Sequence, residues 1–310
     1  MSLFTLILLK VFPIYINVVL GYLSSKFLKV QRESVAALLI YILGPIVVFS
    51  ATVSVKINFA VAFLPVFLYI FGSLIAFTSL ALFKNKWNDP TGNILSFSAG
   101  TGNTGYFGIP LAIIFFEPSL ADIFIFTVLA SLLYESTTGF YVTAMGNFTV
   151  GEALKKISRL PILYAFILGI VLNIAGFEIP AAIHSYTTQF KGAYGILGMM
   201  MLGMGLIGLK NSEGHFDVRF LSIAFFVKFV FWPLAILGCI YLDKTFFQLL
   251  NTDLYKVLFL FSIVPLAGNT VTLAVLLNTK PEKASLAVFI STVVSIITIP
   301  LYIFWYGGFL

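Results

Sequence analysis

The chain alternates between long apolar stretches and short polar connections. A helix needs about 20 apolar residues to cross a hydrocarbon core of roughly 30 Å, and the pattern predicts ten segments of that length. They span approximately residues 3–23, 35–55, 59–83, 93–116, 123–144, 160–177, 190–209, 220–242, 256–277 and 284–306. The predicted fold class is therefore an all-α polytopic membrane protein with ten transmembrane helices.

Composition supports this membrane assignment. Hydrophobic residues make up 60% of the 310 residues and charged residues 10%, whereas soluble domains carry about 25% charged residues. The net charge of +6 does not indicate nucleic-acid binding, because the basic residues lie in short loops between apolar segments, where they set topology. The first segment contains Lys10 and no preceding basic residue, so we expect it to remain as a span and not to be a signal peptide.

Lysine and arginine are distributed unequally between the two membrane sides. When the loops are assigned to alternate sides, one side holds Lys56, Lys191, Lys244 and Lys256, and the other holds twelve basic residues: Lys26, Lys29, Arg32, Lys84, Lys86, Lys155, Lys156, Arg159, Lys210, Arg219, Lys280 and Lys283. Cytoplasmic loops carry the excess of basic residues. The count predicts a multi-pass protein of the cell (inner or cytoplasmic) membrane with both termini outside the cytoplasm.

Two of the ten segments contain helix-breaking residues near their midpoints. Residues 98–110 include four glycines and a proline, residues 264–272 include Pro265 and Gly268, and both stretches contain the tripeptide Gly-Asn-Thr, at 102–104 and 268–270. Glycine and proline weaken the helical hydrogen-bond ladder. Irregular backbone at membrane depth is tolerated where protein or a polar cavity satisfies it, and paired interruptions point to a transporter's binding site.

The shared tripeptide also indicates an internal repeat. Ten spans divide into five plus five, and an odd number per half means that the second half is inserted upside down. We therefore predict a first five-helix repeat in residues 1–150 and a second, inverted repeat in residues 151–310, with broken helices 4 and 9 crossing each other.

The broken helices predict an anion site. If the second half-helices begin at about Gly108 and Thr270, their N-termini meet at the midplane, and each carries roughly +0.5 of an elementary charge with free N–H donors. The first half-helices would expose carbonyl groups that could hold a cation or bond to a side chain. The candidate substrate-binding residues are Asn103, Thr104, Gly105, Pro110, Pro265, Asn269 and Thr270. The alternative is that the asparagines only cap the half-helices.

Four polar residues inside other spans are further candidates. Glu135 lies deep in the fifth segment, where a charge costs about 2.5–3.5 kcal/mol on insertion scales. It is a candidate proton carrier, or one member of a structural ion pair with Lys228, which could instead snorkel to the membrane surface. Lys10 and Asn17 are candidate cavity-lining residues; Lys10 could also snorkel, and Asn17 could bond between helices.

Enzyme motifs are missing from the sequence. There is no H-E-x-x-H, no intramembrane aspartate pair and no G-x-S-x-G, and the single cysteine, Cys239, has no neighbouring histidine. We therefore predict no enzymatic activity, no catalytic residues, no metal site and no cofactor.

The chain resembles the auxin efflux carrier family in its short prokaryotic branch, which contains malate and malonate permeases. The resemblance covers essentially the full length, and its most specific parts are residues 102–110 and residues 264–300. It implies crossed helices 4 and 9, a transport domain of helices 3–5 and 8–10, and a scaffold of helices 1, 2, 6 and 7 that often forms a homodimer. The family's crossover residues correspond to Asn103, Pro110, Pro265 and Asn269. The plant exporters' large loop between helices 5 and 6 is missing here, which argues against auxin as substrate.

The resulting hypothesis is a secondary carrier of a small organic anion, a mono- or dicarboxylate such as malate or malonate, working by an elevator-like movement. One alternative is a sodium-coupled symporter of the bile-acid-symporter type, although the breaks contain no acidic residue to hold sodium. Another is a ligand receptor or channel with a transporter-like fold. Substrate identity, direction and coupling ion do not follow from the sequence.

Overall fold

The described part of the first half of the chain is built from helices. The computed structural model describes residues 3–144, 159–205, 207, 216–277 and 279–306, and the regular elements in these ranges are helical. The first half contains α1 (Leu3–Phe27), α2 (Arg32–Leu38), the π turn η1 (Leu39–Leu43), α3 (Gly44–Ser54), α4 (Phe59–Phe83), the 3₁₀ turn η2 (Lys84–Lys86), α5 (Thr91–Ala99), the π turn η3 (Thr104–Gly108), α6 (Ile109–Phe115), α7 (Pro118–Thr127), α8 (Leu129–Ser136) and α9 (Thr138–Ala144).

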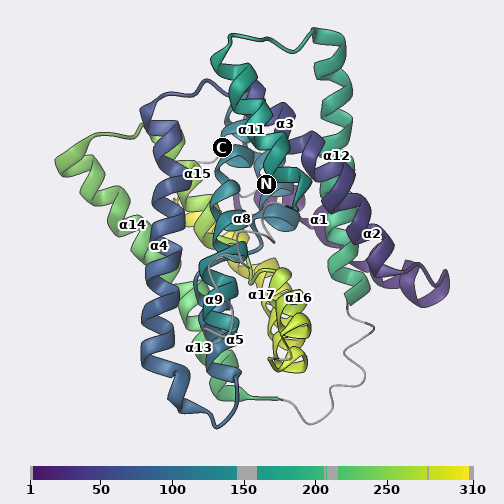
Figure 1. Ribbon diagram of the computed structural model, residues 1–310, viewed down its shortest axis with the longest axis vertical. Coiled ribbons are helices and arrows are strands. Elements are labelled where there is room, and N and C mark those ends of the chain that lie inside the picture. Colours follow the sequence, from purple (N-terminus) through teal and green to yellow (C-terminus); the bar gives the residue numbers. More distant parts are fainter. Residues whose placement is uncertain (1–2, 145–158, 206, 208–215, 278, 307–310) are drawn as a thin grey trace.

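The second half is built in the same way. It contains α11 (Pro161–Ile174), α12 (Ala181–Met204), α13 (Val218–Phe225), the π turn η5 (Phe226–Phe231), α14 (Trp232–Leu242), the π turn η6 (Asp243–Phe247), α15 (Thr252–Ile263), α16 (Asn269–Leu276) and α17 (Pro281–Tyr306). Helices of the two halves are intermixed (Figure 1): α1 packs along α12, and α3 packs along α11.

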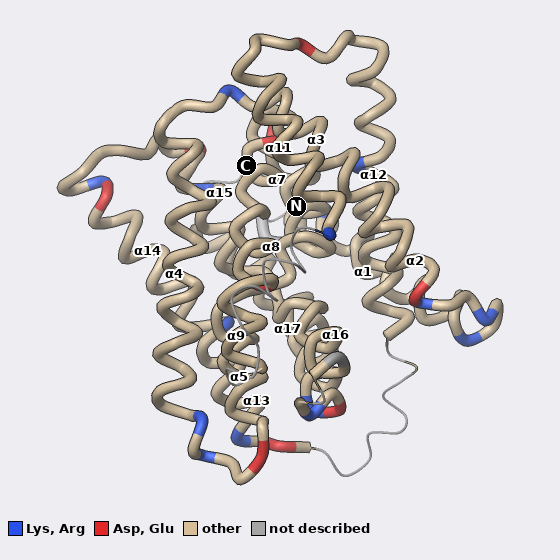
Figure 2. The backbone as a smooth tube through the Cα atoms, viewed as in Figure 1, with Lys and Arg blue, Asp and Glu red and all other residues tan. Residues whose placement is uncertain are grey.

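Within the described residues, six continuous helical stretches are long and apolar enough to cross a membrane. They are Thr5–Phe27, Arg32–Ser54, Phe59–Lys86, Pro118–Ala144, Val218–Phe247 and Pro281–Tyr306. Many of their outward side chains are large and apolar, such as Leu9 and Phe12, which are 54% and 55% exposed. Charged residues lie mostly near helix ends and in loops (Figure 2). The chain is therefore a multi-pass membrane protein.

The division into ten crossings and two inverted repeats goes beyond this finding and stays a prediction. Its boundary at residues 150 and 151 lies outside the described residues, as do three of the basic residues used to predict topology, Lys155, Lys156 and Lys210.

Three π turns share one local cause. Each directly precedes an α-helix with proline at its second position: Pro45 after η1, Pro110 after η3 and Pro233 after η5. Proline cannot donate to the carbonyl four residues earlier and its ring clashes with that carbonyl, so the preceding turn widens. The carbonyl opposite Pro233 belongs to Phe229, and it accepts a hydrogen bond from the Tyr302 hydroxyl. A neighbouring helix thus satisfies the group that proline leaves free, as the membrane interior requires.

Glycines bring α1 and α12 into backbone contact. A Cβ on Gly21 would overlap the Met200 carbonyl oxygen, and a Cβ on Gly203 would overlap the Val18 carbonyl oxygen. Small residues allow this close approach, and in lipid such close packing is a main source of helix association. The two helices therefore form a tightly packed pair.

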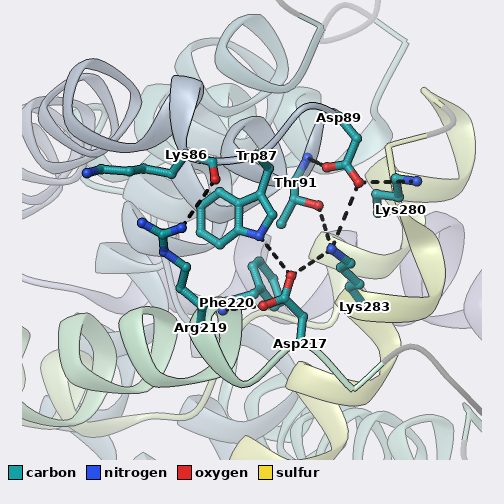
Figure 3. Close-up of polar contacts among 9 residues, drawn as sticks. All are labelled: Lys86, Trp87, Asp89, Thr91, Asp217, Arg219, Phe220, Lys280 and Lys283. Atoms are coloured by element: carbon teal, nitrogen blue, oxygen red, sulfur yellow. Dashed lines mark hydrogen bonds and ion pairs between the residues drawn. The ribbon is translucent and has the colours of Figure 1, made fainter.

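A polar cluster joins the first turns of α5, α13 and α17 (Figure 3). Lys283 Nζ donates to Asp217 Oδ2 at 2.7 Å and to Thr91 Oγ1 at 2.9 Å. Asp89 accepts from the Thr91 backbone N–H at 2.9 Å and pairs with Lys280 at 3.3 Å. These contacts connect three helices that are far apart in the sequence at one end of the molecule.

The environment of Asp217 favours its charged form. Partial burial alone would raise the pKa, but hydrogen bonds from Lys283, the Phe220 backbone N–H and the Trp87 indole outweigh burial and lower the pKa below its ordinary value of 3.8. A carboxylate whose pKa is lower in the folded state stabilises the fold above its ordinary pKa. That contribution is lost as the pH falls through the folded-state pKa.

We predict that Asp217→Asn lowers the thermal unfolding midpoint of the purified protein at neutral pH, because Lys283 loses its charged acceptor. The difference from wild type should shrink as the pH is lowered below 3.8, where the wild-type carboxylate also becomes neutral. Unfolding scans in detergent across this pH range measure both effects. Asp253→Asn is the control, because Asp253 is 60% exposed and pairs only within its own helix turn. A pH-independent difference would contradict the interpretation.

Candidate functional site

Both predicted helix interruptions are present in the structure. Helix α5 ends at Ala99, and the chain becomes helical again at Thr104 in η3. Helix α15 ends at Ile263, and α16 begins at Asn269. The second half-helices thus begin four residues and one residue earlier than the predicted starts at Gly108 and Thr270, because the π turn before Pro110 extends the first of them.

The two breaks are bonded to each other. The Asn103 backbone N–H donates to the Pro265 carbonyl oxygen at 2.8 Å. A Cβ placed on Gly268 would lie 4.0 Å from Asn103 Nδ2, so the side chain of Asn103 reaches the second break. The first break therefore supplies a donor and the second an acceptor to the same hydrogen bond, so the protein itself satisfies these two backbone groups inside the membrane.

Neither asparagine side chain caps its half-helix. Asn103 occupies the N-cap of η3 without a side-chain capping bond. Asn269 is the first residue of α16, and its Nδ2 donates to Glu135 Oε2 at 2.6 Å. The Asn103 side-chain nitrogen is buried and makes no hydrogen bond to the described residues. The capping alternative therefore does not account for either side chain.

A cavity of about 150 Å³ lies beside the breaks. One wall comes from residues 102–106 and 267–269 together with α8, which contributes Glu135. Further lining comes from residues 39–48, from α11 and from α12, which contributes Tyr194. The cavity is therefore lined both by the two helix breaks and by helices of the predicted scaffold.

The predicted substrate-binding residues divide into two groups. Asn103, Thr104, Gly105 and Asn269 line the cavity, and the Thr104 hydroxyl donates to Ser131 Oγ at 2.8 Å. Pro110, Pro265 and Thr270 are buried but do not line it. Pro265 acts through its carbonyl group and Pro110 through the π turn before it, so both shape the breaks from outside the cavity.

The remaining polar candidates lie apart from one another. Glu135 and Lys228 are not brought together, because no ion pair among the described residues includes either of them. Lys228 is only 1% exposed and so does not snorkel to the surface. Lys10 is exposed, with its ammonium 5.8 Å from the centre of the Phe115 ring. Lys10 and Asn17 do not line the cavity.

Aromatic residues complete the site, and the sequence analysis missed them. Tyr106 and Tyr194 line the cavity with ring centres 5.8 Å apart. The Tyr134 hydroxyl donates to the Phe97 carbonyl at 2.9 Å, and the Trp232 indole donates to the Ala99 carbonyl at 2.7 Å. The position of Tyr134 directly before Glu135 was an available signal.

These bonds determine what the first break can bind. Sequence reasoning left two uses for the carbonyl groups at the end of α5, a bound cation or a side-chain donor. At Phe97 and Ala99 the donors are the Tyr134 hydroxyl and the Trp232 indole. Asn103, which lines the cavity, instead carries an amide donor that has no acceptor among the described residues. This arrangement favours a ligand that accepts hydrogen bonds.

Comparison with known proteins points to transport. Residues 145–303 match a family model described as membrane transport protein. Over 306 residues the chain is 29% identical to a protein of Methanocaldococcus jannaschii named "Uncharacterized transporter MJ1031", with 93% of this chain and 95% of that protein covered.

We predict that Asn269 and Glu135 are energetically coupled, because the Asn269 amide donates a short hydrogen bond to the half-buried Glu135 carboxylate. Hydrogen bonds to charged groups contribute about 1.5–3 kcal/mol. The double variant Asn269→Ala/Glu135→Ala should therefore lose less stability than the sum of the two single losses. Thermal midpoints of the four proteins measure the coupling.

The matched control combines Glu135→Ala with Asn173→Ala. Asn173 donates to the carbonyl groups of Thr52, Val53 and Val55 and does not line the cavity, so this pair should be additive. Additive losses for Asn269 and Glu135 would show that their bond does not stabilise the protein.

Proposed function

This chain belongs to the membrane transport protein family, which confirms the resemblance to auxin efflux carriers, and on that premise we propose that it carries a small organic anion across the cell membrane. The proposed cargo is a mono- or dicarboxylate such as malate or malonate. The observation that carries this proposal is the buried Asn103 amide nitrogen, which has no hydrogen-bond partner among the described residues and belongs to a residue that lines a cavity beside the two helix breaks.

A carboxylate suits the donors around this cavity. It would accept a hydrogen bond from Asn103 Nδ2, replacing the partner that the buried amide lacks. The first turns of η3 and α16 face the same cavity through Thr104, Gly105 and Asn269. Helix N-termini favour negative charge through their free N–H groups and the helix dipole. The site thus offers neutral hydrogen-bond donors, which bind an anion but still allow its release on the other side of the membrane.

The size of the cavity favours a small cargo. Its volume is about 150 Å³. Drug-sized ligands occupy pockets of about 300–1,000 Å³. A molecule with a few carbon atoms and one or two carboxylates fits this limit better than a larger aromatic or steroid acid.

The position of the cavity supports an elevator-like movement. We assign α1, α2–α3, α11 and α12 to a scaffold and the remaining helices to a transport domain, so the cavity lies between the two. The buried pair Lys191–Asp122 joins α12 to α7 across the same boundary. Sliding of one group past the other would break this pair, which makes it a contact specific to one conformation.

Two features of the fold would keep each group rigid during such a movement. The glycine contacts between α1 and α12 hold two scaffold helices at backbone distance. The cluster of Asp89, Asp217, Lys280 and Lys283 connects α5, α13 and α17 of the transport group. The proposal includes both termini outside the cytoplasm and a homodimer formed through the scaffold.

Glu135 adds a charge that the carrier must accommodate. It lines the same cavity as Asn103 and accepts the Asn269 hydrogen bond. An anionic cargo next to an ionised Glu135 would be repelled, because like charges interact strongly in a medium of low dielectric constant. Protonation of Glu135 would remove this repulsion, so we propose that a proton accompanies the anion.

We predict that Asn103→Ala weakens binding of the transported acid about 10- to 100-fold, the loss of one hydrogen bond to a charged group. Counterflow exchange in proteoliposomes, tested with malate, malonate and monocarboxylates, measures the effect. Asn17→Ala removes an amide from α1 outside the cavity and should leave exchange unchanged. An unchanged half-saturation concentration in Asn103→Ala would exclude this residue from the site.

We also predict that Glu135→Gln separates exchange from accumulation. The neutral amide imitates the protonated carboxyl, so exchange of internal for external anion should continue. Uphill accumulation driven by a proton gradient should disappear, because Gln binds no proton. Glu117→Gln, at a residue outside the cavity, serves as the control. Accumulation that depends on a sodium gradient in the wild type would overturn proton coupling in favour of a sodium symporter.

A further inference from the structure

Another cavity, of about 220 Å³, lies between helices that the proposed cycle would move past each other. Its lining comes from α1, from the first residue of α2 and from the end of α12 on the scaffold side, and from α16 and α17 on the transport side. It shares no lining residue with the cavity beside the two breaks. It is therefore a different site from the one proposed for the cargo.

Most of this lining is apolar. The aliphatic and aromatic hydrocarbon side chains in it are Val18, Val19, Leu202, Val271, Val288, Phe289, Val293 and Ile296. Val19 and Val293 are also 56% and 46% exposed, and they lie inside the apolar stretches Thr5–Phe27 and Pro281–Tyr306. The cavity thus reaches the outer surface of the protein at membrane depth, between α1 and α17. Such a space favours a hydrocarbon chain over a hydrated ion.

A single cation stands in the described lining. Arg32 is half-buried, and no hydrogen bond or ion pair among the described residues includes its guanidinium. The group lies against the end of α12, where a Cβ on Gly205 would be 3.4 Å from Arg32 Cζ. The neighbouring Glu33 is exposed and does not pair with it. The negative end of the α12 dipole attracts this cation, but five N–H donors still lack acceptors among the described residues.

Arg32 lies at the depth of phospholipid headgroups. It is the first residue of the apolar stretch Arg32–Ser54, and the preceding stretch ends at Phe27. Basic residues gather at the turn between these two stretches (Figure 2), which also contains Lys26 and Lys29. Basic pockets between transmembrane helices bind anionic headgroups. A guanidinium can donate two parallel hydrogen bonds to one phosphate.

We propose that this cavity binds an anionic phospholipid, with the phosphate on the Arg32 guanidinium and an acyl chain in the apolar space between α1 and α17. No acidic residue is among the described lining residues, so the headgroup meets no opposing charge there. A small dicarboxylate suits the site less well, because its second charge would lie against hydrocarbon. The bound lipid would contact helices on both sides of the cavity and so stabilise their present arrangement.

The test measures thermal unfolding of the purified full-length chain in neutral detergent with increasing mole fractions of dioleoyl phosphatidylglycerol or dioleoyl phosphatidylcholine. The wild-type midpoint should rise saturably with phosphatidylglycerol and much less with phosphatidylcholine. Arg32→Gln should raise the half-saturating mole fraction of phosphatidylglycerol about 10- to 100-fold, the loss of one hydrogen bond to a charged group. Malate and inorganic phosphate, added without lipid, should act equally on wild type and Arg32→Gln.

Three further variants make the result specific. Val293→Trp narrows the opening from an exposed position and leaves Arg32 in place, so it should weaken the effect of phosphatidylglycerol. Ile297→Trp is its matched control, because Ile297 lies one turn further along α17, is 64% exposed and does not line the cavity. Lys29→Gln removes an exposed basic residue of the same turn that is outside the lining. Both Ile297→Trp and Lys29→Gln should respond as wild type does.

Three outcomes would overturn the proposal. Equal stabilisation of the wild type by both lipids would show that the headgroup charge is not recognised. An unchanged half-saturating mole fraction in Arg32→Gln would exclude this residue from the site. Stabilisation by phosphate or malate that disappears in Arg32→Gln would identify a site for a soluble anion instead of a lipid. If Arg32→Gln does not fold, the two lipids on wild type and the comparison of Val293→Trp with Ile297→Trp still decide the question. No transport is measured, so failure here leaves the anion proposal to its own exchange assay.

Discussion

The structure depends on one constraint, that backbone polar groups inside a membrane must be satisfied by the protein itself. Two helices stop within the apolar interior, and each stop leaves donors and acceptors that lipid cannot solvate. The protein places the two stops together, so that the Asn103 backbone N–H bonds the Pro265 carbonyl. Tyr134 and Trp232 bond the carbonyl groups at the end of α5. The Asn103 bond therefore needs the second break, whereas α8 and α14 supply the donors to the end of α5.

The same constraint helps to interpret the buried polar groups that have no hydrogen-bond partner among the described residues. Nearly all buried donors in folded proteins are hydrogen-bonded, so the Asn103 amide, which has no partner among the described residues although Asn103 lines a cavity, is informative. Glu135 lines the same cavity and accepts from Asn269 at the second break, and Lys228 lies against Gly102 at the first break, over the Trp232 ring. The two ionisable side chains thus lie at different breaks, and no ion pair among the described residues includes either of them. The site combines neutral donors for a ligand with charges that set its electrostatic environment.

Sequence reasoning located the breaks correctly but left the partners of the charged side chains open. Glycine, proline and the repeated Gly-Asn-Thr act locally on the helical ladder, so Asn103 and Asn269 could be placed without knowledge of packing. An ion pair between Lys228 and Glu135 was one alternative, because both are charged residues within spans; in the structure Glu135 bonds Asn269 and Lys228 faces Trp232. Tyr106 and Tyr194 were missed because aromatic residues are common throughout an apolar chain. Only the tertiary contact of α12 with η3 brings them to the cavity.

By itself, the sequence determined the all-helical membrane character of this protein, the depth of its two interruptions and the family to which it belongs. These properties follow from the length of apolar segments and from the local chemistry of glycine and proline, which act over a few residues. The tertiary structure alone decided which asparagine bonds a carboxylate, which carbonyl groups a tyrosine and a tryptophan hold, and where the buried lysine lies. Those contacts join residues separated by up to 134 positions. Their partners are therefore selected by helix packing and cannot be read from spacing along the chain.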